Sequence, residues 1–293
     1  MLCAVSVKPG SPAGARLRVV AAAEVPLPVG DSETAALRSV MGTIDKNLPT
    51  LAVLARSQYR VRVMPEPTVP ERDMTATLRW SVSTEGDESV DGVNLAWLRI
   101  PTETLLPSKP KQLYAITTPA DALNTRLAIW RQVGVRPKVV DVRETALRNL
   151  AGAVQGDHAG LALLQADEDG VCMVFTHQGS LFMNRFMEQS LAEVGAPHSE
   201  AGRQAQARIG QQLARSIDVV ERTYPFMPIS HVVIAPGPGQ YALAEALGEL
   251  LAIPVEPLDL SRVFDLSAVP ALAKDAGFQS RAFVALGAAL RPA

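Results

Sequence analysis

Apolar and β-branched positions near the start of the chain predict a β-hairpin. Residues 2–7 (LCAVSV) and 15–25 (ARLRVVAAAEV) are rich in strand formers. Residues 8–12 between them contain two prolines and a glycine, which favour a turn over a continued strand. A helix is then predicted as far as about Lys46. Asp31 or Ser32 caps it, because a side-chain oxygen there accepts amide protons of the first turn.

The pattern changes between residues 57 and 111, where prolines are frequent and residues 85–88 (EGDE) are mostly acidic. A short amphipathic segment at 74–82 lies between strand-like pieces at 59–64 and 95–100. This region is predicted to be an inserted subdomain.

Helices and strands alternate through the rest of the chain. Strands are predicted at 51–55, 113–117, 138–142, 161–165, 171–177, 180–186 and 231–235, and helices at 119–133, 144–153, 201–222, 240–252 and 278–290. Each half therefore begins with a β-meander and continues with alternating helices and strands. This weak internal duplication predicts two related α/β lobes that face each other, with a ligand position in the cleft between them.

The longest predicted helix has two distinct faces. One apolar stripe has spacings of four, four, three and four residues, and comprises Ile209, Leu213, Ile217, Val220 and Tyr224. Arg208, Arg215 and Arg222 lie seven residues apart on another face. A phosphate site is one interpretation of this arginine row, but a solvated surface is the favoured one.

Composition narrows the classes of partner. The 293 residues are 47% hydrophobic and 20% charged, which is typical of a folded globular protein. With 28 Lys and Arg against 30 Asp and Glu, the formal net charge is −2, so no global basic field is present and nucleic acid is not an expected partner. Cys3 and Cys172 lie in separate apolar runs, which predicts buried free thiols in a reducing compartment.

The start of the chain, MLCAVSV, has no charged leader and too short an apolar run for a signal peptide. No window approaches the roughly 18 apolar residues of a membrane-spanning helix. We therefore expect a cytoplasmic protein that contacts a membrane only through a partner.

Candidate catalytic chemistry is sparse. The four histidines are scattered, neither cysteine has a C-x-x-C partner and no G-x-S-x-G is present, so neither a protein metal site nor a nucleophilic triad is predicted. Residues 235–239 (APGPG) join a strand to a helix, where amide protons could face an anion, but a plain turn is the favoured interpretation because two prolines remove donors. Residues 167–170 (DEDG) could hold Mg²⁺, although a solvated hairpin turn is the more usual role of such a cluster.

Several phrase-like stretches together resemble the PilM/MshI family of actin-like proteins of type IV pilus assembly, and most closely its MSHA-type branch. The resemblance extends over nearly the whole chain. It rests on residues 55–59 (ARSQY), 69–71 (VPE), 78–80 (LRW), 139–150 (VVDVRETALRNL), 213–224, 232–237, 253–260 (IPVEPLDL) and 286–291 (LGAALR).

The resemblance implies an α/β, actin-like fold with two lobes around a nucleotide cleft. The first lobe would comprise residues 1–56 and 112–155, the inserted α+β subdomain 57–111, and the second lobe 156–293. It also implies a cytoplasmic scaffold that binds the tail of a PilN-like bitopic inner-membrane protein. The cytoplasmic part of the type II secretion L protein is a related alternative, which normally continues into a membrane-spanning helix.

The sequence departs from the family at the expected ATP site. The first hairpin of PilM-like proteins carries an Asp, a Gly and small hydroxylic residues, whereas this chain has Ser6, Lys8 and Pro9, followed by Gly10 and Ser11. The second hairpin has Gln165 in place of Asp, and Asp167 in place of a Gly that would admit phosphate. A carboxylate there would repel a phosphate by about 1 kcal/mol or more at close range.

On the adenine side, the family's Gly-Gly survives only as Gly237 and Gly239 around a proline. We therefore expect a degenerate nucleotide site and a non-catalytic scaffold of an MSHA-like pilus, with no cofactor. The alternative is an ATP-binding or ATP-hydrolysing homologue that uses ATP with Mg²⁺.

In the inserted subdomain, Arg79 and Trp80 are candidate partner contacts, because Arg and Trp dominate interface hot spots. The competing interpretation is that Trp80 packs beneath the subdomain.

Overall fold

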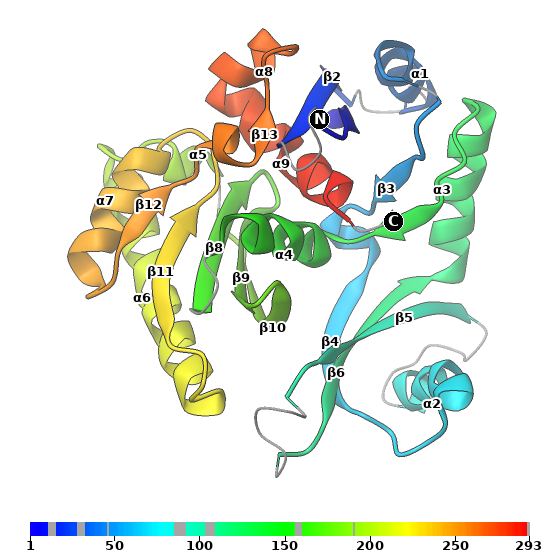
Figure 1. Ribbon diagram of the computed structural model, residues 1–293, viewed down its shortest axis with the longest axis horizontal. Coiled ribbons are helices and arrows are strands. Elements are labelled where there is room, and N and C mark those ends of the chain that lie inside the picture. The colour runs from blue at the N-terminus through cyan, green and yellow to red at the C-terminus, as the bar shows by residue number, and fades with distance from the viewer. Residues whose placement is uncertain are drawn as a thin grey trace.

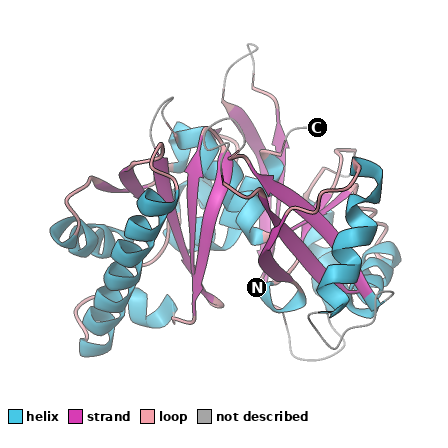
Figure 2. Ribbon diagram, turned by 90° about the horizontal axis from the view of Figure 1, so that it is seen from below, coloured by secondary structure: helices cyan, strands magenta, loops and turns pink. Residues whose placement is uncertain are grey.

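The computed structural model describes residues 1–10, 16–27, 33–45, 47–84, 92–102, 109–155, 160–189 and 191–291. Within these ranges the strands form four sheets, with helices packed around them (Figures 1 and 2). None of the helices in this described part is long and apolar enough to cross a bilayer.

The predicted N-terminal hairpin is confirmed. Strands β1 (Leu2–Lys8) and β2 (Leu17–Val25) pair antiparallel. A third strand, β13 (Phe264–Asp265), joins this sheet parallel to β2 from the far end of the chain. A two-residue strand is too short to show any periodicity, which is why the sequence pattern does not predict it.

The rest of the first half surrounds a small parallel sheet of β3 (Leu51–Val53) and β7 (Val139–Asp141). Helix α1 (Glu33–Thr43) and helix α3 (Ala120–Gln132) accompany this sheet, as the pattern predicts. The residues proposed as the α1 cap, Asp31 and Ser32, lie outside the described residues. A short 3₁₀-helix, Arg56–Gln58, leads into the inserted region.

The inserted region is an antiparallel sheet covered by one helix. Its strands are β4 (Arg60–Pro65), β5 (Val93–Ile100) and β6 (Gln112–Pro119) in the order β4-β6-β5, and helix α2 (Glu71–Thr84) packs on this sheet. Residues 112–119 are predicted to belong to the first lobe, but β6 is the central strand of the insert's sheet. The pattern identified this strand correctly, yet a buried run such as Leu113 to Ala115 does not disclose which strands flank it.

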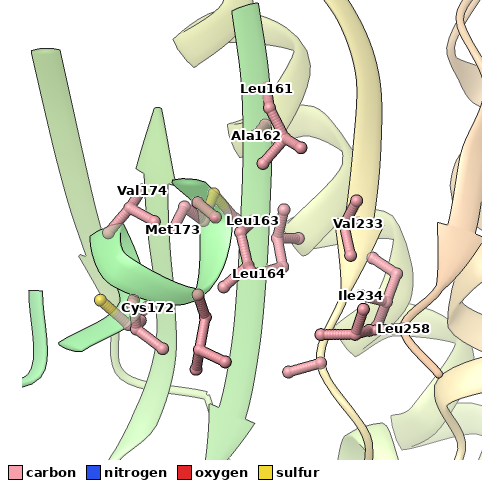
Figure 3. Close-up of a cluster of buried hydrophobic side chains, with 14 of the residues drawn as sticks. Leu161, Ala162, Leu163, Leu164, Cys172, Met173, Val174, Val233, Ile234 and Leu258 are labelled. Atoms are coloured by element: carbon pink, nitrogen blue, oxygen red, sulfur yellow. The ribbon is translucent and has the colours of Figure 1, made fainter. Parts of the chain in front are cut away.

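The second half is built on a five-stranded sheet in the order β10-β9-β8-β11-β12. The predicted meander is confirmed, and β11 and β12 extend the sheet in parallel. Apolar side chains of β8, β9 and β11 and Leu258 fill the core beside it (Figure 3). The strands are β8 (Gly160–Asp167), β9 (Gly170–His177), β10 (Ser180–Met187), β11 (Ile229–Ile234) and β12 (Val255–Pro257).

The long helix α6 (Glu200–Thr223) begins at Ser199, whose hydroxyl accepts the amide proton of Gly202. Its apolar stripe is buried as predicted, with Ile209, Leu213 and Val220 inaccessible to solvent. The three arginines of the row are all exposed, and Arg222 pairs with Asp218 on the same helix. The row therefore fits the favoured interpretation of a solvated surface. Helices α5 (Leu191–Val194) and α7 (Gln240–Leu250) also belong to this half.

Helices α4 (Arg143–Val154) and α9 (Ala276–Ala289) lie in the middle of the molecule and pack on each other (Figure 1). They cross closely at Gly287, where an added Cβ would lie 2.3 Å from the carbonyl oxygen of Ala146. Asn149 also donates a hydrogen bond to the Gly287 carbonyl. Helix α9 contacts β1, β3 and β8, so the C-terminal segment joins strands of both halves. The 3₁₀-helix Leu260–Arg262 and helix α8 (Pro270–Lys274) precede it.

Candidate functional site

The buried side chain of Arg143, at the start of α4, reaches the turn between β8 and β9. Nη2 of Arg143 lies 2.7 Å from Oδ2 of Asp167 and 2.8 Å from Oδ2 of Asp169. The Arg143 side chain is only 7% exposed, whereas Asp169 at the turn is half exposed. Two carboxylates of the predicted second phosphate turn are thus paired with a cation from α4.

The start of α4 is held rigidly by its own contacts. The Asp141 carboxylate accepts the amide proton of Val142, and the Tyr59 hydroxyl accepts that of Arg143. The same Tyr59 hydroxyl donates to the buried carboxylate of Glu144 at 2.8 Å. The amide protons at a helix start need acceptors, and here side chains supply them. These hydrogen bonds therefore hold the backbone of Arg143 in place, and its side chain extends from there to the turn.

Burial and charge pairing together shift the pKa values of Arg143 and Asp167 in this cluster. Burial lowers the pKa of the Arg143 guanidinium, but Asp167 and its other anionic neighbours outweigh burial, so the pKa is raised overall. Burial also raises the pKa of Asp167, and in this case Arg143 opposes the shift without cancelling it. The ionised carboxylate of Asp167 therefore depends on Arg143 for its compensation.

Gln165 lies next to this cluster. Its side chain is buried and its Nε2 donates to Oδ2 of Asp167 at 3.3 Å, while its Oε1 has no hydrogen-bond partner in the described part of the chain. The structure thus brings the two predicted residues of the second hairpin together with Arg143. The pairing with Arg143 also compensates the charge of Asp167 at a position where the resemblance implies glycine.

The Gly237 loop, which follows β11, is linked to β8 through Ser280. Gly237 lies against Ser280, whose hydroxyl donates to the Ala166 carbonyl at 3.4 Å. The Gly237 amide proton already has an acceptor, Oε1 of Gln240. Gly239 has φ +76°, and a Cβ there would lie 2.6 Å from the Val194 carbonyl oxygen. Both glycines therefore have structural roles that need no ligand.

The first hairpin forms a separate group. Nζ of Lys8 lies 2.8 Å from Oδ2 of Asp45, and the Ser6 hydroxyl accepts the amide proton of Asp45. Within the described ranges, no hydrogen bond or ion pair joins this group to Gln165 or Asp167. Gly10 is the last described residue before the gap at 11–15, so Ser11 lies outside the described residues.

Arg79 and Trp80 lie on α2, on the inserted subdomain. Met74, Leu78 and Val82 form the buried face of this helix, and Trp80, two positions from Leu78, points the other way and is 62% exposed. The interpretation that Trp80 packs beneath the subdomain is therefore wrong. Nε of Arg79 is buried and has no hydrogen-bond partner in the described part of the chain.

Sequence reasoning did not single out Arg143, Glu144, Tyr59 or Asp45 as site residues. For Arg143 and Glu144 a signal exists, because two charged residues directly follow a short apolar strand at the start of a helix. For Asp45 there is none, since its partner Lys8 is 37 residues away. No cluster of His, Cys, Asp and Glu suited to hold a metal ion occurs among the residues that the structure describes.

No protein-family model matches the chain. No curated sequence matches it. Among solved structures, a PilM–PilN type IV pilus biogenesis complex is similar with a TM-score of 0.73 and 18% identity, covering 98% of this chain and 95% of that one.

Two more distant structures are also similar. A Bacteroides thetaiotaomicron protein of actin-like ATPase fold has a TM-score of 0.48 and 9% identity, covering 93% and 96% of the two chains. The cytoplasmic domain of EpsL, an inner-membrane component of the type II secretion system of Vibrio cholerae, has a TM-score of 0.40 and 13% identity, covering 68% and 76%. The chain has an α/β, actin-like fold, as expected from its sequence.

Proposed function

We propose that the protein is a scaffold of type IV pilus assembly, of the MSHA type, that binds the cytoplasmic tail of a PilN-like bitopic inner-membrane protein. The observation that carries the proposal is the similarity, over almost the full length of both chains, to a structure of a PilM–PilN complex. The sequence stretches that resemble the PilM/MshI family support the same assignment. In this proposal the protein is cytoplasmic and reaches the inner membrane only through its partner.

The proposed scaffold works without bound nucleotide. ATP with Mg²⁺ needs free amide donors and a carboxylate available to the metal. Here Arg143 pairs with Asp167 and Asp169, and Asp45 pairs with Lys8. These contacts support a site whose charges are satisfied internally, so the residues present do not suit Mg·ATP.

The exposed face of α2 is the candidate surface for the partner. An exposed tryptophan is unusual on a surface that contacts only water, and tryptophan and arginine are the residues that contribute most to interfaces. Arg79, the preceding residue on α2, is only partly exposed and its Nε is buried, so Trp80 is the residue of this face that the test addresses.

The test is binding of the purified protein to a fluorescently labelled cytoplasmic tail of the neighbouring bitopic pilus protein, followed by anisotropy. We expect binding by the wild-type chain and a loss of at least ten-fold in affinity for Trp80→Ala. Tyr241→Ala on α7 is the matched control, because Tyr241 is likewise an exposed aromatic residue. Equal losses for both variants would exclude the α2 surface, and no binding by the wild type would contradict the scaffold role.

The competing function is an active ATP-binding homologue. A thermal melt with and without millimolar Mg·ATP distinguishes the two, because a ligand at 100 times its dissociation constant stabilises by about 2.7 kcal/mol. Such a gain moves the Tm by roughly 5 °C or more. We expect no shift, and a clear upward shift would contradict the nucleotide-free scaffold.

A further inference from the structure

A cavity of about 430 Å³ lies at the C-terminal end of α3. Leu127, Val135 and Pro137 supply its apolar part, and Arg131 and Arg136 supply its polar part. Its volume falls within the range of small-ligand and side-chain pockets, roughly 300–1,000 Å³. The cavity is distinct from the β8–β9 turn and from the exposed face of α2.

The backbone around this cavity is fixed by a helix-ending motif. The amide of Val135 donates to the Trp130 carbonyl and that of Gly134 donates to the Arg131 carbonyl. Gly134 has φ +78°, the left-handed conformation that this motif requires. Val135 is buried beside Trp130, and the chain turns back so that Arg136 and Arg131 line the same cavity.

Both arginines lack an anionic partner among the residues that the structure describes. Both side chains are exposed. By contrast, Arg99, Arg143 and Arg281 each form ion pairs with carboxylates. Residues 122–140 contain three arginines and a lysine but no Asp or Glu. Arg131 also offsets the negative end of the α3 dipole, but Arg136 lies beyond the helix and has no such role.

We propose that this cavity binds a peptide segment of a partner protein in which an apolar side chain is flanked by carboxylates. The apolar floor suits a leucine-sized side chain, and two guanidiniums suit carboxylates, with which arginine forms paired hydrogen bonds. The concave apolar floor favours such a segment over a flat lipid surface. This contact is separate from the tail binding proposed above.

The test uses a fluorescein-labelled peptide of sequence EELEE and measures its anisotropy with the full chain at low salt. We expect saturable binding that weakens several-fold when the leucine is replaced by serine (EESEE) and that weakens as salt rises. The variant R131E/R136E should lose at least ten-fold in affinity. The control R60E/R215E makes the same change in net charge at two other exposed arginines without ion pairs in the described residues, and should bind as the wild type does.

Because glutamate at position 131 opposes the α3 dipole, Arg136→Gln serves as a second variant that leaves the helix unchanged. A several-fold loss in this variant, with an unchanged Tm, supports the proposal. Equal binding of EELEE and EESEE, or equal loss in R131E/R136E and R60E/R215E, overturns it. Binding to phosphatidylglycerol vesicles that depends on Arg131 and Arg136, without peptide binding, assigns the site to a membrane and also overturns it.

Discussion

The two β-hairpins at which the family resemblance implies degenerate phosphate loops differ in how their charged side chains are paired. The first hairpin presents a cation, Lys8, which pairs with Asp45 near the surface, where their side chains are 45% and 28% exposed. The second presents two carboxylates, which pair with a buried cation, Arg143. Exposed ion pairs contribute little to stability, whereas breaking a buried pair is strongly destabilising. Because Arg143 is buried, the ion pairs of the second hairpin are therefore expected to contribute more to the stability of the fold than the pair of the first hairpin.

The largest effect is expected on removing the buried cation. Arg143→Met keeps most of the apolar stem but leaves the largely buried Asp167 without its compensating charge. We expect a loss of about 3 kcal/mol in the free energy of unfolding, measured by urea titration. Arg222→Met on α6 is the control, because its pair with Asp218 is exposed on both sides, and it should change stability by less than about 0.5 kcal/mol.

The pH dependence of stability distinguishes the loss of charge pairing from the loss of packing in Arg143→Met. The pKa of Asp167 is already raised by burial, and without Arg143 it rises further. A carboxyl whose folded pKa lies above its unfolded value disfavours folding when ionised, and this penalty disappears as the pH falls through the folded pKa. The deficit of Arg143→Met should therefore shrink as the pH is lowered from 7 toward 4. A deficit that is constant with pH would assign the effect to lost packing.

The cysteines give a second comparison of the same hairpins, since Cys3 lies on β1 and Cys172 on β9. Burial, followed by the charge of Glu24, raises the pKa of Cys3 from 9.0 to about 11, so at pH 8 its thiolate is about 100-fold scarcer than in an unperturbed thiol. Burial raises the pKa of Cys172 as well, and this thiol is inaccessible. In a timed reaction with a thiol reagent, Cys3 should react about 100-fold more slowly than glutathione, and Cys172 only on unfolding. Rapid labelling of Cys172 in the folded protein would show that the second hairpin opens.

A smaller effect is expected when the Asp167 carboxylate, which has no cation in Arg143→Met, is itself removed. In the Arg143→Met background, Asp167→Asn eliminates a carboxylate that has lost its cation, and its amide still reaches Gln165. We expect the second substitution to restore about 1 kcal/mol in that background and to destabilise the wild type. The full cycle of four proteins, compared by urea titration, isolates the pairwise interaction. Destabilisation of equal size in both backgrounds would contradict a direct coupling between the two side chains.

Most elements of the fold could be predicted because their patterns are local. The stripe of α6 and the meander β8-β9-β10 follow from periodicity that tertiary contacts do not alter. The neighbour of each strand is not a local property. For this reason the sequence pattern predicts the strand β6 but not its place in the inserted region, and it does not predict β13, which pairs with β2 across more than 200 residues.

The candidate site was predictable only in part for the same reason. Asp167 is identifiable in the sequence as a departure from a phosphate loop, whereas the charged start of α4 does not reveal that Arg143 pairs with Asp167, 24 residues later on another element. The exposure of Trp80 could in principle be predicted, because the spacing of Met74, Leu78 and Val82 already defines the buried face of α2.

The smallest effect is expected at the first hairpin. Lys8→Met removes the cation of an exposed pair, so the Tm should change by less than about 1 °C, and by still less in high salt. The hydrogen bond from Lys8 lowers the pKa of Asp45, so the contribution of the pair is present at neutral pH and is lost only as the pH falls below about 3.8, the ordinary pKa of the carboxyl. The wild-type advantage in melting curves should therefore be smaller at pH 3 than at pH 7. A drop in Tm as large as that of Arg143→Met would mean that both hairpins depend equally on their internal ion pairs.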